Sequence, residues 1–437
     1  MVIDERARWF GFWLLDRKNG GVIRKAYDEI RYAYRNGTSV AETEEKIAKL
    51  IDHARRTTKF YSDIPEGAGL SDMPIVNKDT YRADYDAFLS SEYLNEKGSR
   101  IMSTSGSTGT PLRIVQNLDK VRHDTADGIF FGAMADYYIG MKMGFIRVWV
   151  HNVTKSPLRL LAENMIMVDS SDLGEEALTE MLDMIRKKKV KCLLGYASAL
   201  AEMSRFIETH DVDTSKFSVT SIIPISESMP TVVKEKLKEQ FHCPVQQWYS
   251  NEENGIIGIQ GRDNDVYYID SENFYFEILK LDSDEPAEPG ELGRIVITDL
   301  RNYAMPIIRY DNGDLAVYKR VEKDGRFKLY LTELYGRRSD TIYDTAGNAL
   351  TPFIITNNLW DVEGVRQYRF LQDTKDTYTL ELNGDPDVMD EEDILGRILP
   401  YFGEGAKINI VYVDEIPVLN SGKRKYIENR CPEYVGR

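Results

Sequence analysis

Apolar and polar positions alternate with a regular rhythm through the middle of the chain. Residues 175–189 place apolar side chains at helical spacing, and the short apolar run 190–194 follows them. The same alternation continues with predicted helices at 197–210 and 230–241 and predicted strands at 219–225 and 245–249. Short apolar strands separated by helices predict a parallel sheet that is covered by helices. Ligands of such sheets bind beyond the carboxyl ends of the strands, and Ser226 and Tyr249 both stand at such ends.

The pattern changes twice towards the C-terminus. Val266 to Leu331 is rich in strand-forming residues, which predicts a smaller barrel or antiparallel unit packed on the parallel sheet. Its predicted strands are 266–269, 274–279, 294–298, 307–310, 315–318 and 327–331. After Gly336 the predicted elements are strands at 377–382 and 407–413 and a helix at 391–400, enough for a small α+β domain. The fold class is therefore α/β, with a large N-terminal domain (1–336, its β-rich subdomain at about 262–336) and a small C-terminal domain (337–437).

Length, charge and cysteine content narrow the class of protein. The chain has 437 residues, which predicts two or three domains. Its net charge of −15 argues against a large nucleic-acid-binding face, although an acidic chain can still bind ATP through magnesium and a few local donors. Cys192, Cys243 and Cys431 form no CxxC pair, which favours a reducing cytoplasm and predicts neither a disulfide framework nor a zinc site. We also expect no transmembrane segment, because no run of 18 apolar residues occurs.

An aromatic cluster stands near the N-terminus. Trp9, Phe10, Phe12 and Trp13 lie in an apolar run that is too short to span a bilayer. We expect this run to form a helix docked on the larger domain, with contact to a membrane interface as the alternative.

The run from Ser103 to Pro111 is the first candidate for chemistry. Hydroxyl residues and two glycines crowd between apolar Ile101-Met102 and the strand-like Leu112 to Val115. Glycines allow close backbone approach, and the N–H and hydroxyl donors suit phosphate oxygens. The run is neither a Walker A loop nor a dinucleotide fingerprint, and a Ser/Gly-rich run by itself is more often a surface turn.

Taken with later segments in order, this run resembles the adenylate-forming superfamily of acyl-CoA ligases and adenylation domains. The similarity extends from about residue 100 to the end of the chain. The local sequence of these segments is most similar to the phenylacetate–CoA ligase branch. Residues 195–200 and 225–227 are typical of its CapK-like members, which are associated with capsule biosynthesis. The later matching segments are Trp248 to Glu253, Pro289 to Leu300, Pro306 to Asp314, Gly336 to Asp340 and Asn420 to Lys423.

The resemblance implies ATP-dependent formation of an acyl- or aryl-adenylate with release of pyrophosphate, followed by transfer to a thiol, most simply CoA. In that scheme the phosphates bind the loop residues Ser103, Thr104, Ser105, Gly106, Ser107, Thr108 and Gly109. Tyr249 stacks on adenine, with a core tyrosine as the alternative. The Ser226-Glu227 segment lines the other face of adenine.

The same resemblance assigns the remaining polar residues. Asp314 binds the ribose hydroxyls, although Asn312-Gly313-Asp314 is also typical of a hairpin turn. Arg309 is a site residue or a solvated strand charge, and Arg337 lies near ribose and phosphate.

The resemblance assigns metal binding and catalysis to Glu253 and Lys423. Glu253 holds Mg²⁺, with Glu252 as the alternative ligand. Lys423 offsets charge at the α-phosphate during adenylation, and Lys425 is its competitor. A mobile C-terminal domain rotates about a hinge at Ser339 and Asp340.

Four positions depart from the family pattern: Leu112 replaces the usual loop lysine, and Ser250, Glu252 and Ser339 are also unusual. Two other hypotheses therefore stay open. One is adenylation with transfer to a carrier protein or an amine in polysaccharide or natural-product biosynthesis. The other is a non-catalytic nucleotide-binding relative. The identity of the acid and the oligomeric state are not indicated by the sequence.

Overall fold

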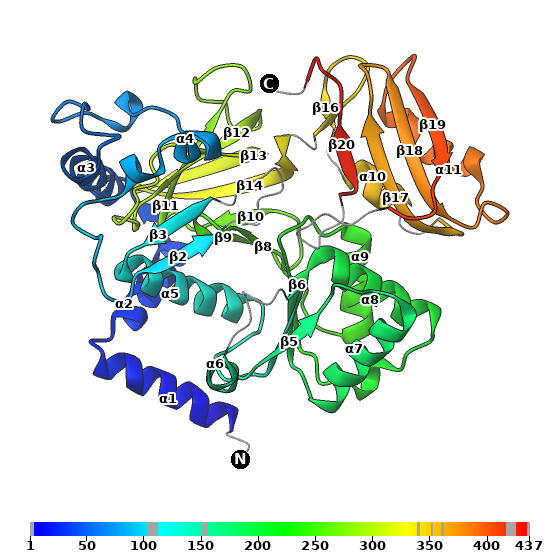
Figure 1. Cartoon of the computed structure of the whole chain (residues 1–437), viewed down its shortest axis with the longest axis horizontal. Helices are drawn as coiled ribbons and strands as arrows, with labels where there is room; N and C mark the ends of the chain where they lie inside the picture. Colours follow the sequence, from blue (N-terminus) through cyan, green and yellow to red (C-terminus); the bar gives the residue numbers. More distant parts are fainter. Residues whose placement is uncertain are drawn as a thin grey trace.

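The structure is a computed structural model that describes residues 4–103, 112–149, 156–338, 341–350, 353–359, 362–416 and 425–434. The predicted loop residues from Thr104 to Gly109, the predicted hinge at Ser339 and Asp340, and Lys423 lie outside the described residues. Figure 1 shows two large β-containing layers on the left and centre and a smaller unit at the right, which contains the last part of the chain.

A parallel sheet forms the centre of the N-terminal region. Its strands follow the order β5 (Met165–Asp169), β4 (Met143–Arg147), β6 (Cys192–Tyr196) and β7 (Ser221–Ile225). The helices α7 (Glu175–Lys187), α8 (Ala197–Thr209) and α9 (Thr231–Phe241) alternate with these strands along the chain. The apolar stripe of α7 is buried against this sheet in one core, as its helical spacing predicts. The predicted helix-covered parallel sheet is therefore confirmed.

A second, larger sheet is almost entirely antiparallel. Its strands run in the order β11-β12-β13-β14-β10-β9-β8, and β1 (Thr38–Ser39) pairs with β14. The bounds are β8 (Trp248–Asn251), β9 (Gly255–Gln260), β10 (Tyr267–Ile269), β11 (Phe274–Leu279), β12 (Leu292–Asp299), β13 (Tyr310–Lys323) and β14 (Arg326–Arg337). The predicted β-rich unit is thus an antiparallel sheet, which Figure 1 shows in yellow and green.

Three details of this sheet differ from the sequence prediction. The predicted strand 245–249 is divided: Val245 forms an isolated parallel bridge with Ile222 of β7, whereas β8 begins at Trp248 and pairs antiparallel with β9. Residues 307–309 are not a strand, and Arg309 there has a positive φ of 49°. The Asn312-Gly313-Asp314 segment lies inside β13 and is not a hairpin turn. The turn occurs later, at Asp324-Gly325, where both residues have positive φ.

The remaining elements of the N-terminal region are helices, short 3₁₀ turns and a hairpin. The helices are α1 (Glu5–Lys18), α2 (Val22–Asn36), α3 (Val40–Thr57), α4 (Lys78–Ala83), α5 (Leu118–Met134) and α6 (Pro157–Glu163), with 3₁₀ turns at Leu70–Asp72, Tyr85–Phe88 and Thr214–Lys216. The hairpin strands β2 (Arg100–Ser103) and β3 (Arg113–Gln116) are antiparallel and flank the predicted phosphate loop. No described helix is long and apolar enough to cross a bilayer.

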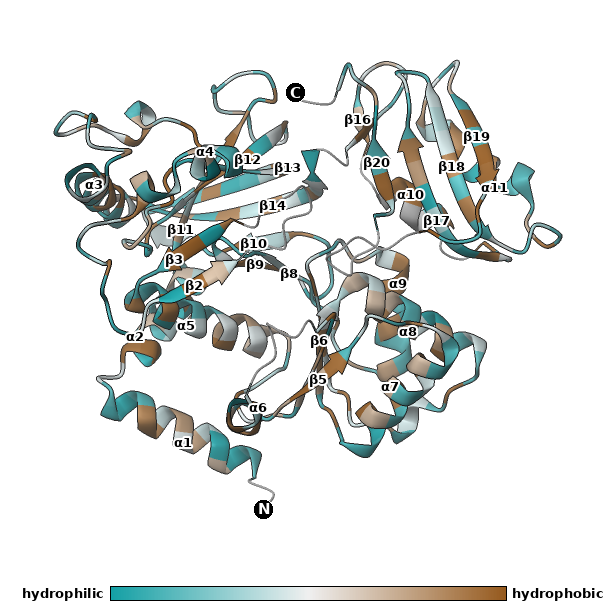
Figure 2. Cartoon of the chain, in the orientation of Figure 1, coloured by the Kyte–Doolittle hydropathy of each residue, from teal (hydrophilic) through white to brown (hydrophobic). Residues whose placement is uncertain are grey.

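The C-terminal unit has its own sheet and its own core. Its sheet order is β19-β18-β17-β20, and brown apolar strands mark this sheet in Figure 2. The bounds are β15 (Ile342–Tyr343), β16 (Ala349–Leu350), α10 (Phe353–Leu359), β17 (Val365–Gln372), β18 (Thr377–Gly384), α11 (Glu391–Ile398), a 3₁₀ turn at Leu399–Tyr401, β19 (Lys407–Tyr412) and β20 (Ile427–Asn429). Arg205 of α8 donates to the carbonyls of Val365 and Arg366, so this unit rests against the helices of the parallel sheet. The predicted α/β fold class with a small α+β C-terminal unit is confirmed.

Candidate nucleotide-binding site

Two of the predicted nucleotide residues meet in space although 65 residues separate them. The hydroxyl of Tyr249 on β8 donates to Asp314 Oδ2 on β13 at 2.8 Å. Asn312 Nδ2 donates to the same hydroxyl at 2.8 Å and to Asp314 Oδ2 at 3.1 Å. Burial, followed by the Asp314 carboxylate, raises the pKa of Tyr249 well above its ordinary value, so the hydroxyl stays protonated and can donate. One carboxylate oxygen is therefore fixed, and the other faces the neighbouring arginine.

That neighbour is Arg337, at the end of β14. Its Nε lies 3.5 Å from Asp314 Oδ1, and its Nη1 donates to the carbonyl of Asn312 at 2.7 Å. Asp314 pairs with Arg337 across the two strands, so the β13–β14 register itself brings the two side chains together. Half of the Arg337 side chain remains exposed. The result is a carboxylate and a guanidinium side by side on the paired strands β13 and β14.

A second carboxylate lies close to this pair. Glu253 follows β8 and is buried, whereas its neighbour Glu252 is exposed. Glu253 Oε1 accepts a hydrogen bond from the Tyr310 hydroxyl at 3.0 Å and lies 3.6 Å from Lys78 Nζ. Burial lowers the pKa of Lys78, and Arg337 acts in the same direction, while Glu253 opposes them. A half-buried lysine at the start of α4 therefore supplies a cation beside the candidate metal ligand.

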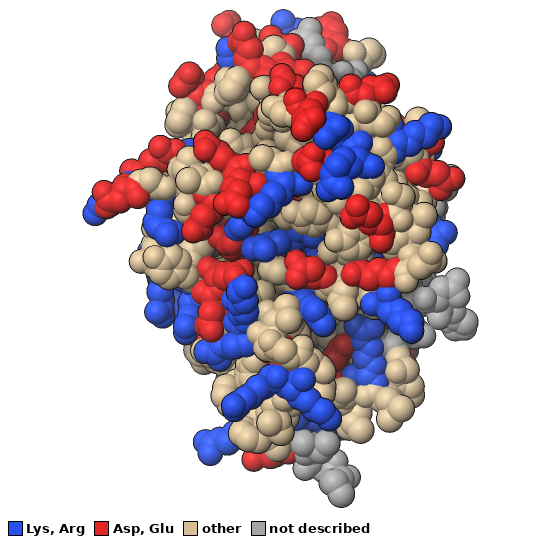
Figure 3. Space-filling view, turned by 90° about the vertical axis from the view of Figure 1, so that its left-hand side faces the viewer, with Lys and Arg blue, Asp and Glu red and all other residues tan. Residues whose placement is uncertain are grey.

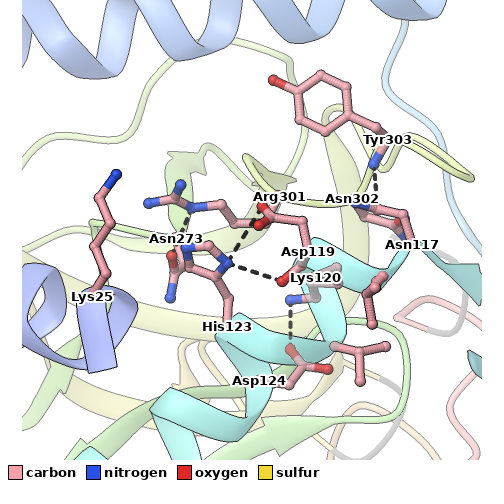
Figure 4. Close-up of polar contacts among 12 residues, drawn as sticks. Lys25, Asn117, Asp119, Lys120, His123, Asp124, Asn273, Arg301, Asn302 and Tyr303 are labelled. Atoms are coloured by element: carbon pink, nitrogen blue, oxygen red, sulfur yellow. Dashed lines mark hydrogen bonds and ion pairs between the residues drawn. The ribbon is translucent and has the colours of Figure 1, made fainter. Parts of the chain in front are cut away.

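The turn that carries Glu253 is tied to α5 by a fully buried lysine. Lys120 Nζ donates to the carbonyl of Asn254 at 2.7 Å and pairs with Asp124 and Asp299 at 3.0 and 2.9 Å. Figure 4 shows Lys120 beside Asp124 on the same helix. Arg100 of β2 also pairs with Asp124. This network, which we call the Lys120 cluster, links the base of the β2–β3 hairpin to the turn that follows β8.

The Ser226-Glu227 segment follows β7 at the carboxyl edge of the parallel sheet. Ser226 is exposed and has a φ of 70°, a conformation that non-glycine residues adopt rarely and that recurs at functional sites. Glu227 Oε2 accepts from the backbone N–H of Ser198 at 2.9 Å, near the start of α8. The glutamate therefore anchors the segment to the helix, and the backbone of Ser226 is presented to solvent.

A cationic and aromatic cluster lies at the same sheet edge. Tyr196 pairs with Ile225 across β6 and β7, so it is next to Ser226. Arg147, at the end of β4, lies 5.5 to 6.0 Å from the ring centroids of Phe145, Trp149 and Tyr196. Such distances allow attraction between the guanidinium and the ring faces.

Arg309 does not join these groups. Its guanidinium binds Glu277 through two hydrogen bonds of 3.1 and 3.0 Å and donates to the carbonyl of Met73 at 3.0 Å. The residue is 7% exposed. Arg309 is therefore committed to a buried ion pair that joins the antiparallel sheet to the N-terminal segment, and it is not the solvated strand charge that was the alternative.

Sequence reasoning missed the cations and the second tyrosine around Glu253. Lys78 and Lys120 stand in no motif that the sequence analysis recognised, and a lysine near a helix start is usually solvated. Tyr310 lies in the matching segment Pro306 to Asp314, but the resemblance assigned it no role. Leu112, which stands where the family has a loop lysine, is buried in the core below α3 and α4. Lys78 supplies a cation to this part of the site from a different segment of the chain. Ser103, the first predicted loop residue, ends β2.

The chain is similar to known proteins in sequence and in fold. A family model described as the CapK C-terminal domain matches residues 342–430. Protein CapK of Staphylococcus aureus is 20% identical over 434 residues, which cover 92% of this chain and 92% of that protein. The chain is thus similar over nearly its whole length to the CapK-like branch of the adenylate-forming superfamily, and its C-terminal part matches the CapK family model.

Two ligases extend the comparison. Phenylacetate-coenzyme A ligase of Thermus thermophilus is 25% identical over 325 residues, covering 68% of this chain and 70% of the ligase. The fold matches 2-hydroxyisobutyryl-CoA ligase in its postadenylation state with a TM-score of 0.70 at 14% identity, covering 89% and 88% of the two chains. The same ligase with 2-HIB-AMP and CoA in its thioesterification state matches with a TM-score of 0.58 at 15% identity, covering 89% of each chain. The predicted resemblance is thus confirmed at the level of branch and fold.

Proposed function

We propose that the protein activates a carboxylic acid with ATP and then transfers the acyl group to a thiol, with CoA as the acceptor. A carboxylate oxygen attacks the α-phosphorus, the bond to the β-phosphate oxygen breaks, and pyrophosphate leaves. The thiol sulfur then attacks the acyl carbon, AMP leaves with the bond electrons, and the thiol proton passes to solvent. This chemistry depends mainly on positioning and on neutralising charge.

The contact between Tyr249 and Asp314 is the observation that carries the proposal. It joins a predicted adenine residue on β8 to a predicted ribose residue on β13 through a 2.8 Å hydrogen bond, although β14, β10 and β9 separate these strands in the order of the sheet. The Asp314 oxygen that faces Arg337 accepts hydrogen bonds from the ribose hydroxyls. Ser226 presents backbone from the opposite sheet to the adenine ring. Arg309 is left out, because its donors bind Glu277 and Met73.

Two cations and the phosphate loop compensate the negative charge of the phosphates in this proposal. Lys78 and Arg337 are both close enough to Glu253 to interact with it electrostatically. Each can donate a hydrogen bond to a phosphate oxygen. The loop from Ser103 to Gly109 binds the β- and γ-phosphates in this proposal. The Lys120 cluster holds the base of the hairpin and the Glu253 turn in a fixed relation, which favours phosphoryl positioning.

Glu253 fits a magnesium ion by its chemistry. Hard divalent cations take carboxylate oxygens and usually rely on one or two protein carboxylates plus substrate phosphates. Bound there, Mg²⁺ would neutralise charge on the phosphates as pyrophosphate departs. Tyr310 donates to Oε1 of Glu253 and so orients the carboxylate. Glu252 remains the alternative ligand because it is exposed one residue earlier.

The acid binds at the edge of the parallel sheet, beside Arg147 and Tyr196, in this proposal. This edge adjoins Ser226, so an acid there lies next to the adenine position. Transfer to CoA is supported by likeness to 2-hydroxyisobutyryl-CoA ligase, which was crystallised with an adenylate and CoA. We propose that the C-terminal domain (337–437) rotates about Ser339 and Asp340 on the N-terminal domain (1–336) between the two half-reactions.

Exchange of pyrophosphate into ATP tests the first half-reaction. Purified protein is incubated with ATP, Mg²⁺ and labelled pyrophosphate against a panel of aryl, fatty and hydroxy acids. Acid-dependent exchange supports the proposal and names the substrate class. ATP binding by calorimetry without exchange for any acid favours the non-catalytic relative, and absence of ATP binding refutes the nucleotide site. With the active acid, CoA is then compared with a carrier protein and with amines as acceptor.

A substitution at Lys423 distinguishes the adenylation step from the thioester-forming step. Lys423→Ala should lose acid-dependent exchange but keep thioester formation from a supplied acyl-adenylate, because its charge acts only at the α-phosphate. Lys425→Ala is the matched control, since it removes the same charge two residues away. Equal loss in both variants would contradict the role of Lys423.

A further inference from the structure

Helix α1 is apolar on both of its sides. Its inner side packs on the molecule: Trp13 meets the Tyr27 ring of α2 edge to face at 6.1 Å, and Phe12 is half-buried. Its outer side exposes Phe10, Leu14 and Leu15 by 63%, 56% and 58%. A helix at the surface of a soluble protein normally turns a charged or polar face to water. The outer face of α1 therefore exposes large apolar side chains between the charged residues at its two ends.

The apolar surface continues onto two neighbouring segments. Arg8 of α1 donates to the carbonyls of Leu161 and Ala162, which fixes α6 beside α1. Leu158 and Leu161 of α6 are 80% and 52% exposed. The loop with exposed Tyr138 packs against the start of α1, because an atom added at Gly140 would meet the carbonyl of Glu5.

These segments form the surface that we call the α1–α6 patch. Its members are Trp9, Phe10, Leu14, Leu15, Tyr138, Leu158 and Leu161. They are seven of the seventeen large apolar side chains that are exposed among the described residues, so the exposure is concentrated and not scattered. Figure 2 shows brown segments on α1 and α6, both at the lower edge of the molecule.

The charges around the patch are sorted by sign. The acidic residues of α1 turn inward: Asp16 is buried and accepts the N–H groups of Ile23 and Arg24, and Glu5 pairs with Lys191 at 2.8 Å. The basic residues Arg6, Arg17 and Lys18 are exposed at the two ends of the helix. At the lower end of Figure 3 the surface is accordingly tan and blue, and red is sparse. A locally basic surface on a chain of net charge −15 is attracted to an anionic partner.

We propose that the α1–α6 patch docks the protein on an anionic lipid bilayer, with α1 lying in the plane of the headgroups. Exposed aromatic and leucine side chains enter the acyl boundary, while arginine and lysine at the helix ends contact lipid phosphates. The sorting of charge argues against a second copy as the occupant. A symmetric dimer through this face would bring two sets of the same cations together, which repel each other.

Vesicle flotation with the full chain tests the proposal. Vesicles of phosphatidylcholine alone are compared with vesicles that contain about 30% phosphatidylglycerol, at low and at high salt. The assay measures binding and does not depend on catalytic activity. We expect binding to the anionic vesicles to be about tenfold stronger than to the neutral ones and to weaken with salt. Phe10→Ser with Leu14→Ser, and separately Arg17→Glu with Lys18→Glu, should each reduce binding about tenfold.

Leu94→Ser is the matched control, because Leu94 is 62% exposed outside the patch. It should leave binding unchanged, and circular dichroism should show all variants folded. Three outcomes overturn the proposal: no preference for anionic vesicles, equal loss in the control, or a dimer in light scattering that the Phe10 and Leu14 substitutions dissociate. The last result would assign the patch to a second copy of the chain.

Discussion

Replacement of Lys120 by methionine removes the only charge of that side chain while keeping most of its volume. Lys120 is 0% exposed, and its ammonium lies 4.5 Å from the centroid of the Phe274 ring. Burial alone would lower the pKa of Lys120, but Asp124 and Asp299 raise it above the ordinary value. The native lysine is therefore charged. In the variant, the carboxylates of Asp124 and Asp299 and the carbonyl of Asn254 lose their contact with the Lys120 ammonium.

The expected loss of stability follows from these contacts. Removing one partner from a buried ion pair costs about 3 to 5 kcal/mol, because a buried charge is left uncompensated. The two pairs at 3.0 and 2.9 Å place Lys120→Met in this range. Burial raises the pKa of Asp299, and loss of Lys120 raises it further. Above about pH 4, Asp299 in the folded state of Lys120→Met holds a proton that the unfolded chain has lost. The free energy of unfolding of this variant therefore falls as pH rises.

Urea denaturation of the full chain, followed by tryptophan fluorescence at pH 5 and pH 8, measures both effects. Lys49→Met is the control, because Lys49 forms the same kind of i,i+4 pair with Glu45 at the surface. We expect no measurable change in this control. A loss below about 1 kcal/mol for Lys120→Met at pH 8, or a loss that does not shrink at pH 5, would refute the reasoning.

Three further predictions concern titration and the site. Burial, aided by Arg301 and Lys120, lowers the pKa of His123 to about 3, so between about pH 3 and 6.5 the unfolded chain binds more protons and stability falls with acidification. His123→Gln should flatten that slope by up to about 1.4 kcal/mol per pH unit in denaturation curves. Burial and Asp270 raise the pKa of Asp127, so Asp127→Asn should gain stability relative to wild type from pH 5 to pH 8; the opposite trend contradicts this assignment. Lys78→Met should raise the KM for ATP in pyrophosphate exchange about tenfold or more, whereas an unchanged KM would remove Lys78 from the phosphate site.

Local patterns determined most of the architecture. The helical spacing in 175–189 and the short apolar strands after it fixed the helix-covered parallel sheet, because each element must bury one apolar face. The ordered motifs also predict the similarity to the CapK-like branch that the comparisons show. Local reasoning failed where an irregular backbone overrides propensity: residues 307–309 are not a strand, and β8 joins the antiparallel sheet although its residues suit either sheet.

Only the tertiary structure decided which of the candidate residues act together. The hydrogen bond from Tyr249 to Asp314 spans 65 residues, and the one from Lys120 to Asn254 spans 134. Periodicity describes neighbours within one element, so it cannot reveal partners that strand order and register bring together. The same limit explains why Arg309, in a recognised motif, is committed to Glu277, while Lys78, in no recognised motif, lies beside Glu253. Sequence determines which chemistry is available, and packing decides which groups are close enough to use it.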